Sequence, residues 1–241
     1  MNQVKASDSL VTQGHILSRL SFGATSSVIE EVNQAGIEAY IQSQLRPQSI
    51  KESPVLAKYL AKLGSINREP VELYADALAF REQLENSKLS TKQQDAIQQD
   101  LRKLSVKTIN EAADARLARG IYANRQLQEV MVDFWINHFN VHVQKSGVKF
   151  WLHDYENQIR SHSLGNFDDL LMATAKHPAM LMYLDNKNNT APESPWGKKN
   201  NQGLNENYAR ELMELHTLGV DGGYSQDDVI TLARILTGWS L

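Results

Sequence analysis

The sequence predicts an all-α protein, because helical hydrophobic spacing and helix caps recur along it while strand-like alternation does not. Apolar residues repeat at intervals of three and four in nearly every segment of the 241 residues, which places them on one face of a helix. Ser, Thr and Asn precede several of these runs, and Gly or Pro bounds them, as in capped helices. We therefore expect a multi-helix orthogonal bundle of short capped helices, with one long polar helix and one long loop.

The composition indicates a globular protein that forms one helical domain over residues 1–241. Hydrophobic residues make up 41% of the chain and charged residues 22%, which is enough for a sizeable core. The absence of cysteine excludes disulfides, thiolate metal sites and cysteine nucleophiles. The net charge of −3 argues against a nucleic-acid partner that binds through a strongly basic surface.

The chain carries no recognisable targeting or membrane-spanning segment. No apolar run approaches the roughly 18 residues of a transmembrane helix. The N-terminal run MNQVKASDSLVTQGHIL lacks a basic region followed by an apolar one, so it does not resemble a signal peptide. The residues themselves leave the cellular compartment undetermined.

Short capped helices are expected through the first third of the chain. Thr25 has the chemistry of an N-cap for a helix that ends at Gly36, and a further helix spans residues 37–45. Pro54 and Pro70 each stand in the first turn of a predicted helix, where the missing N–H of proline costs nothing.

A long polar segment follows, and we expect it to form a helical arm over residues 86–120. Ile97, Leu101 and Leu104 give it only a narrow apolar stripe, which is typical of a mostly solvated helix. A coiled-coil partner site is the alternative. Gly120 is expected to separate this arm from the next element, with a continuous helix as the alternative.

The second half is expected to hold aromatic core helices, a long loop and two closing helices. Residues 125–141 and 148–162 are the aromatic helices, and residues 185–203 contain two prolines and no apolar period. A stretch of this kind is usually functional or disordered. The closing helices are residues 204–218 and one that begins at the capping box of Ser225 with Asp228.

The 204–218 helix carries the first group of candidate site residues. At about 100° per residue, Glu211 and His216 fall within the face formed by the apolar side chains, which are Leu204, Tyr208, Leu212, Leu215 and Leu218. A carboxylate on such a face needs a cation, a metal or several hydrogen-bond donors.

Arg210 on the same helix lies between Glu206 and Glu214 at i,i+4 spacing. Glu211 and Glu214 are candidate acid, base or metal-binding groups, His216 a ligand or proton carrier, and Arg210 an anion-binding or orienting group. A buried ion pair that ties helices together, and a solvated charge ladder, are the structural alternatives.

The 125–141 helix carries the second group of candidates. His138 and His142 are four residues apart, which places two imidazoles on one helical face, so with Glu211 they are candidate ligands for a divalent metal. Core histidines satisfied by hydrogen bonds are the alternative. Arg125 and Glu129 form a further i,i+4 pair. No other cofactor is indicated.

Four stretches of the sequence resemble a large bacterial family, domain of unknown function 1800. The longest is Asn205–Trp239, NENYARELMELHTLGVDGGYSQDDVITLARILTGW; the others are HILSRLSFGAT at residues 15–25, RQLQEVMVDFWINHFNV at 125–141 and HPAMLMYLDN at 177–186. They occur in the family order and span most of the chain.

The resemblance implies a mostly helical fold and export to the bacterial periplasm or cell surface, but no agreed activity. It also implies a partner, a second exported protein of the domain-of-unknown-function 1501 family. Family domains continue well beyond the Leu-Thr-Gly-Trp motif, so we expect this chain to be an N-terminal half, completed by a C-terminal half of the same domain.

Two functional hypotheses follow. The first is an envelope enzyme, by analogy a polymer hydrolase, with a Glu/His/Arg pocket between the 125–141 and 204–218 helices. The second is a non-catalytic envelope scaffold or assembly partner, in which the same residues form a structural ion-pair network.

Overall fold

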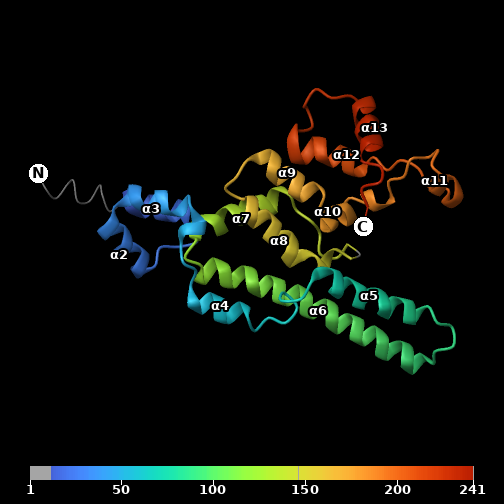
Figure 1. The fold of residues 1–241 in the computed structure, drawn as a ribbon, viewed down its shortest axis with the longest axis horizontal. Helices are drawn as coiled ribbons and strands as arrows, with labels where there is room; N and C mark the ends of the chain where they lie inside the picture. The colour runs from blue at the N-terminus through green and yellow to red at the C-terminus, as the bar shows by residue number, and fades with distance from the viewer. Residues whose placement is uncertain (1–11, 146, 241) are drawn as a thin grey trace, which may run out of the picture.

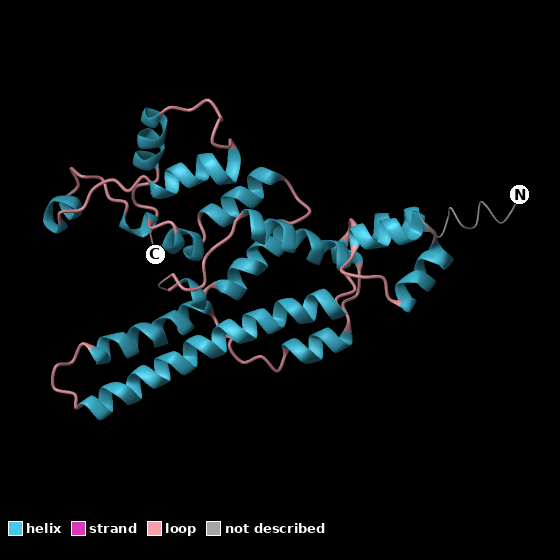
Figure 2. Ribbon diagram, turned by 180° about the vertical axis from the view of Figure 1, so that it is seen from behind, coloured by secondary structure: helices cyan, strands magenta, loops and turns pink. Residues whose placement is uncertain are grey.

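Helices carry all the regular secondary structure of residues 12–145 and 147–240, which a computed structural model describes (Figures 1 and 2). Residues 1–11, on which the prediction of no signal peptide rests, lie outside the described residues. After a first helix at residues 12–20, the α-helices are α2 (Ser26–Ala35), α3 (Ile37–Gln44), α4 (Pro54–Leu60), α5 (Pro70–Leu84), α6 (Thr91–Tyr122), α7 (Gln126–His138), α8 (Leu152–His162), α9 (Phe167–Ala175), α10 (Pro178–Tyr183), α11 (Pro195–Asn200), α12 (Asn207–Glu211) and α13 (Gln226–Ile235). The all-α prediction is confirmed.

Several helices begin where local side-chain chemistry predicts. The Thr25 hydroxyl accepts a hydrogen bond from the backbone N–H of Val28 at 3.3 Å, and Gly36 ends α2 with a φ of 87°. Ser225 and Asp228 form a reciprocal capping box at the start of α13. These caps satisfy backbone N–H groups that have no partner within the helix.

The long polar helix α6 forms an antiparallel hairpin with α5, and this hairpin projects from the body of the molecule (Figure 1). The helix runs through Gly120 to Tyr122, so the expected break at Gly120 is wrong. One glycine costs a helix only about 1 kcal/mol. The buried Ala112, Ala115 and Ala118 on the same helix supply packing that offsets this cost.

The buried apolar side chains form a main cluster and two satellites. The main cluster draws on α5, α7 to α10, α12 and α13. Leu17, Val32 and Tyr40 form a separate small cluster within the first three helices, which lie at one end of the molecule (Figure 1). The N-terminal helices therefore have a small core of their own, which is separate from the main cluster.

The predicted loop at residues 185–203 is present but contains a 3₁₀ turn, Asn186–Asn188, and the helix α11. Two buried asparagines connect it to α13 and the residues after it. The Asn186 amide donates to the carbonyls of Leu236 and Trp239 at 3.1 and 2.9 Å. The Asn189 amide donates to the Ala233 carbonyl at 2.8 Å. These hydrogen bonds, rather than the packing of an apolar helical face, hold the segment against α13 and the residues after it.

Within the described part of the chain, every helix is too short or too polar to cross a membrane.

Candidate functional site

The predicted 204–218 helix is α12 followed by a π-helical segment, Leu212–Thr217. Two hydrogen bonds, each between residues five positions apart, show this wider turn. The backbone N–H of Leu218 donates to the Met213 carbonyl at 2.8 Å, and the Thr217 hydroxyl donates to the Leu212 carbonyl at 2.7 Å. Such π segments are rare and frequently occur at functional sites.

The π segment changes which side chains face the core. Four residues of an α-helix rotate the chain by about 40° more than a full turn. Four residues of a π-helix rotate it by less than a full turn. A π segment therefore shifts the direction of the side chains that follow it. His216 is only 5% exposed and Tyr208 is fully buried, whereas Leu215 and Leu218 are 60% and 56% exposed. The prediction that Leu215 and Leu218 share one face with the buried Tyr208 is wrong, because a uniform α-helical wheel does not include this register shift.

The charged candidates on this helix lie at its half-exposed side. The Arg210 guanidinium approaches Glu206 at 3.3 Å and Glu214 at 3.7 Å and donates to the Gln226 side chain at 2.8 Å. The predicted i,i+4 ladder is thus confirmed as a partly solvated network. Glu211 is half-buried, and among the described residues none forms a hydrogen bond or ion pair with its side chain.

His138 and His216 lie together at the contact between α7 and the π segment. The His138 Nε2 atom donates to the His216 carbonyl at 3.0 Å, and the two ring centroids are 6.4 Å apart. Burial, and secondarily the neighbouring His138, lowers the pKa of His216 to about 4. The His216 imidazole is therefore neutral at pH 7.

His142 does not share a helical face with His138. Helix α7 ends at His138, and His142 lies exposed in the irregular segment that follows. The i,i+4 geometry that motivates a metal site requires a helix that continues to His142, and α7 ends four residues before it. Across residues 12–145 and 147–240, no three His, Asp or Glu side chains are grouped so that they could hold a metal ion.

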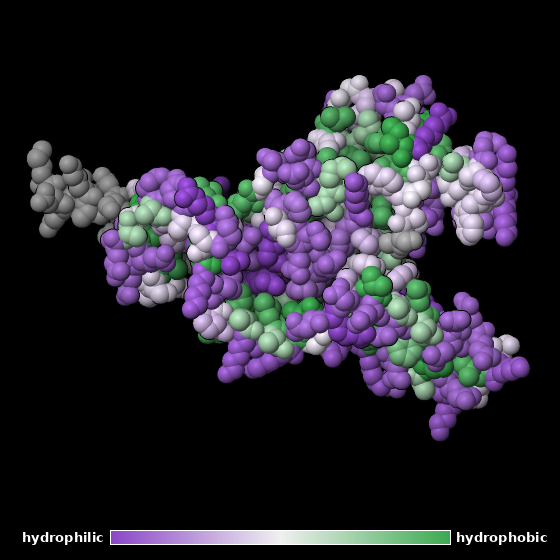
Figure 3. All heavy atoms as spheres, in the orientation of Figure 1, coloured by the Kyte–Doolittle hydropathy of each residue, from purple (hydrophilic) through white to green (hydrophobic). Residues whose placement is uncertain are grey.

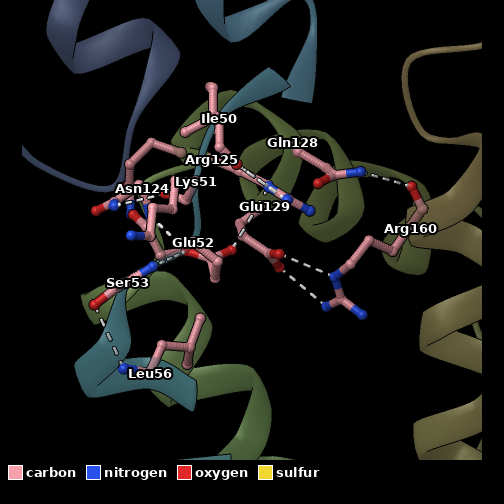
Figure 4. A network of polar contacts seen from close by, with 12 residues as sticks. Ile50, Lys51, Glu52, Ser53, Leu56, Asn124, Arg125, Gln128, Glu129 and Arg160 are labelled. Carbon is pink, nitrogen blue, oxygen red and sulfur yellow. Dashed lines mark hydrogen bonds and ion pairs between the residues drawn. The ribbon is translucent and has the colours of Figure 1, made fainter. Parts of the chain in front are cut away.

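A more deeply buried charge network lies between α7 and α8 (Figure 4). The Arg160 guanidinium donates to both carboxylate oxygens of Glu129 at 2.9 and 3.0 Å and pairs with Glu156. The Arg160 side chain is 12% exposed, and those of Glu129 and Glu156 are 6% and 9% exposed. The two carboxylates outweigh the desolvation of the guanidinium and raise the pKa of Arg160.

The predicted pairing of Arg125 with Glu129 is wrong, because each side chain has a partner elsewhere. The Arg125 guanidinium donates to the Ile50 carbonyl at 3.0 and 3.2 Å (Figure 4). The Gln128 side-chain amide donates to the Arg160 carbonyl at 3.1 Å. Polar contacts therefore fix α7 both to the segment before α4 and to α8.

Two further basic groups adjoin this network and have unpartnered atoms. The Nε of Arg119 and the Nδ1 of His153 are buried and lack a hydrogen-bond partner among the residues that the structure describes. Burial is the main cause that lowers the pKa of Arg119. Burial, followed by the charges of Arg119 and Arg160, lowers the pKa of His153 to about 4, so this imidazole is neutral at pH 7.

The sequence analysis did not identify Arg119, His153, Glu156 or Arg160 as site residues. Their only local signal is the i,i+4 spacing of Glu156 and Arg160, which many exposed helices share.

His177 is also oriented by contacts at both ring nitrogens. Its Nδ1 accepts a hydrogen bond from the Ala179 backbone N–H at 3.1 Å, so its Nε2 carries the proton and donates to Asp154 at 2.9 Å. His177 is buried and caps the start of α10. This histidine has a structural role that fixes α10 against α8.

A cavity of about 990 Å³ lies where the N-terminal helices meet α6 and α7. Phe22 and Tyr40 line it from the N-terminal side, and Leu117, Glu129 and Asp133 from the other. Its volume is at the upper end of the range for small-molecule sites. The 204–218 candidates lie elsewhere, since the cavity is lined by residues between Phe22 and Asp133.

Residues 15–241 match the protein family described as Protein of unknown function (DUF1800). The chain belongs to this family. Comparisons with curated proteins and with solved structures give no match. Two of the stretches that carry the DUF1800 resemblance, residues 15–25 and 125–141, meet at the cavity, where Phe22 contributes its backbone N–H to a 3.1 Å bond with the Gln126 side chain.

Proposed function

We propose that this DUF1800 protein acts as a non-catalytic assembly module of the bacterial envelope and uses the π-helical segment as its contact face. The main support for this proposal is the exposure of two leucines in the segment. The segment presents Leu215 and Leu218 to solvent at 60% and 56% exposure, while Arg210 beside them is engaged by Glu206, Glu214 and Gln226.

The neighbouring turn and helix support this role. Val220 and Ile235 are 70% and 66% exposed, and hydrophobic residues reach the surface over α12 and α13 (Figure 3). Exposed apolar groups of this kind mark protein-interaction sites when they are rimmed by polar residues. The Glu206–Arg210–Glu214 ladder supplies such a rim.

The partner proposed is an exported protein of the domain-of-unknown-function 1501 family, in the periplasm or at the cell surface. This contact would bury apolar side chains that cost free energy when they remain in water.

The test is binding of the purified full-length protein to that partner, measured by calorimetry. The double variant Leu215→Ser/Leu218→Ser should weaken binding at least tenfold, because it removes two apolar contacts from the face. The matched control is Val71→Ser, which changes a 62% exposed side chain on α5 and should leave binding unchanged. Undiminished binding by the double variant would refute the proposal.

A catalytic role is the second candidate, and one observation favours it. The Tyr224 hydroxyl is shielded from solvent, and burial, followed by the charge of Glu214, raises its pKa. Glu214 in turn lies 3.7 Å from Arg210, so an acid group, a carboxylate and a guanidinium are neighbours here. Under this hypothesis Glu211 and Glu214 act as acid, base or metal ligands, with His138, His142 and His216 as further ligands or proton carriers.

Metal analysis of the full-length protein tests the ligand roles. Stoichiometric divalent metal that is lost in Glu211→Ala would support them and count against the assembly role for this face. Metal content that is the same in wild type and Glu211→Ala would eliminate them.

A further inference from the structure

The cavity between the N-terminal helices and α6/α7 combines an apolar wall with a polar group that has no partner. Phe22, Leu117 and Ile121 line it and are 53%, 65% and 65% exposed. Tyr40 also lines it and is 2% exposed. Its hydroxyl is buried without a hydrogen-bond partner among the described residues.

An unpartnered buried hydroxyl is unusual, because leaving it unsatisfied costs about 1–3 kcal/mol. Tyr40 lies in the small core of the N-terminal helices with Leu17 and Val32, and this packing fixes its ring at the cavity wall. The amide of Gln44, which also lines the cavity, does have partners. Gln44 bonds the backbone of Asn124 and Leu127 at 3.0 and 3.2 Å.

The charges around the cavity are predominantly negative. Glu31, Glu129 and Asp133 contribute carboxylates to its lining, against the single guanidinium of Arg116. Arg116 is paired with Asp133, and Glu129 is paired with Arg160. The one carboxylate of the lining without an ion pair in the described structure is Glu31, and its charge also acts on the Tyr40 hydroxyl.

We propose that this cavity binds a small amphiphilic organic cation, with its apolar body against Phe22, Leu117 and Ile121 and its protonated amine near Tyr40 and Glu31. The Tyr40 oxygen accepts a hydrogen bond from the ammonium group, and Glu31 supplies the opposite charge. The volume of about 990 Å³ accommodates such a molecule. This site is separate from the π-helical contact face, and its test is independent of the assembly role.

The experiment is calorimetric titration of the full-length protein at pH 7 with three probes that share one alkyl chain: octylamine, octanol and octanoate. Octylamine should bind saturably at one site and at least tenfold more tightly than octanoate. Glu31→Gln should reduce this preference to under about threefold, because it removes the unpaired carboxylate. Equal affinity for the three probes, or no saturable binding of octylamine, would overturn the proposal.

Tyr40→Phe separates a ligand-binding role from a structural one. The hydroxyl has no partner in the free protein, so its removal should leave the thermal midpoint unchanged or raised, while octylamine affinity falls about fivefold through the lost hydrogen bond. The matched control is Tyr59→Phe on α4, a tyrosine that is 38% exposed and lies outside the cavity lining; it should bind as wild type does. Unchanged affinity in Tyr40→Phe would contradict the assignment.

Discussion

Two glutamate–arginine pairs with the same i,i+4 spacing differ sharply in their surroundings. Glu156 and Arg160 on α8 are 9% and 12% exposed, whereas Glu206 and Arg210 at α12 are 37% and 38% exposed. The first pair meets a third charged group, Glu129, from another helix, and the second meets only Glu214 and Gln226 at the surface. Spacing along one helix thus predicts a pair, but the helix packed against it decides whether the pair is buried.

The largest effect should come from removing the cation of the buried network. Arg160→Met leaves Glu129 and Glu156 buried without their partner, and we expect a loss of about 3–5 kcal/mol in the free energy of unfolding. Urea denaturation at pH 7 measures it. The control Arg210→Met should lose less than about 1 kcal/mol. Similar losses in the two variants would contradict the difference in burial.

Acidification should destabilise the protein through His153 and His216, whose imidazoles are neutral in the folded protein at pH 7. The pKa values of His153 and His216 are lowered to about 4 in the folded protein, so unfolding takes up protons below the ordinary value of about 6.5. Their contribution is complete above pH 6.5 and is lost as the pH falls toward 4. For each group it is about 3 kcal/mol.

The measurement is the free energy of unfolding between pH 7 and pH 4 in wild type and His216→Gln. The variant should lose less on acidification than wild type does, because glutamine does not titrate. His142→Gln, which changes an exposed histidine, is the control and should follow the wild-type curve. Parallel curves for wild type and His216→Gln would refute the assignment.

A moderate effect is expected from the asparagine that connects the 185–203 segment to α13. Asn189→Ala removes the bond to the Ala233 carbonyl and leaves the Asn205 N–H unpaired, which should cost about 1–3 kcal/mol. Chemical denaturation gives the value. The exposed Asn200, which makes one bond within its own helix, provides the control; a loss as large in Asn200→Ala would indicate that burial does not matter here.

The smallest effect should come from Glu211, the residue that the helical wheel places on an apolar face. Glu211 is half-buried and without a described partner, so both Glu211→Gln and Glu211→Leu should change the free energy of unfolding by less than about 1 kcal/mol. A large loss from both, measured by denaturant midpoint, would instead indicate a buried pair.

The helices and their ends could be predicted because their signals are local. Thr25, Gly36 and the Ser225–Asp228 box each act within four residues of the backbone that they cap. The order of the 185–203 segment could not be predicted, since it depends on Asn186 and Asn189 bonds to residues 44 to 53 positions away.

The candidate site could be predicted only in part, because its geometry depends on long-range packing. The ladder around Arg210 follows from sequence spacing and is present. The π turn that exposes Leu215 and Leu218 has no sequence signal that we recognise. The bond between Glu129 and Arg160 joins residues 31 positions apart, so neither helix alone reveals it.

A pair of double-mutant cycles tests the central contrast most directly, because each isolates the coupling between two side chains. Glu129 with Arg160, replaced singly and together by Gln and Met, should show a coupling energy above about 2 kcal/mol. Glu206 with Arg210, replaced in the same way, should show about 0.5 kcal/mol or less. Equal coupling in the two pairs, or stronger coupling at Arg210, would contradict a buried network between α7 and α8 and a solvated ladder at the π-helical face.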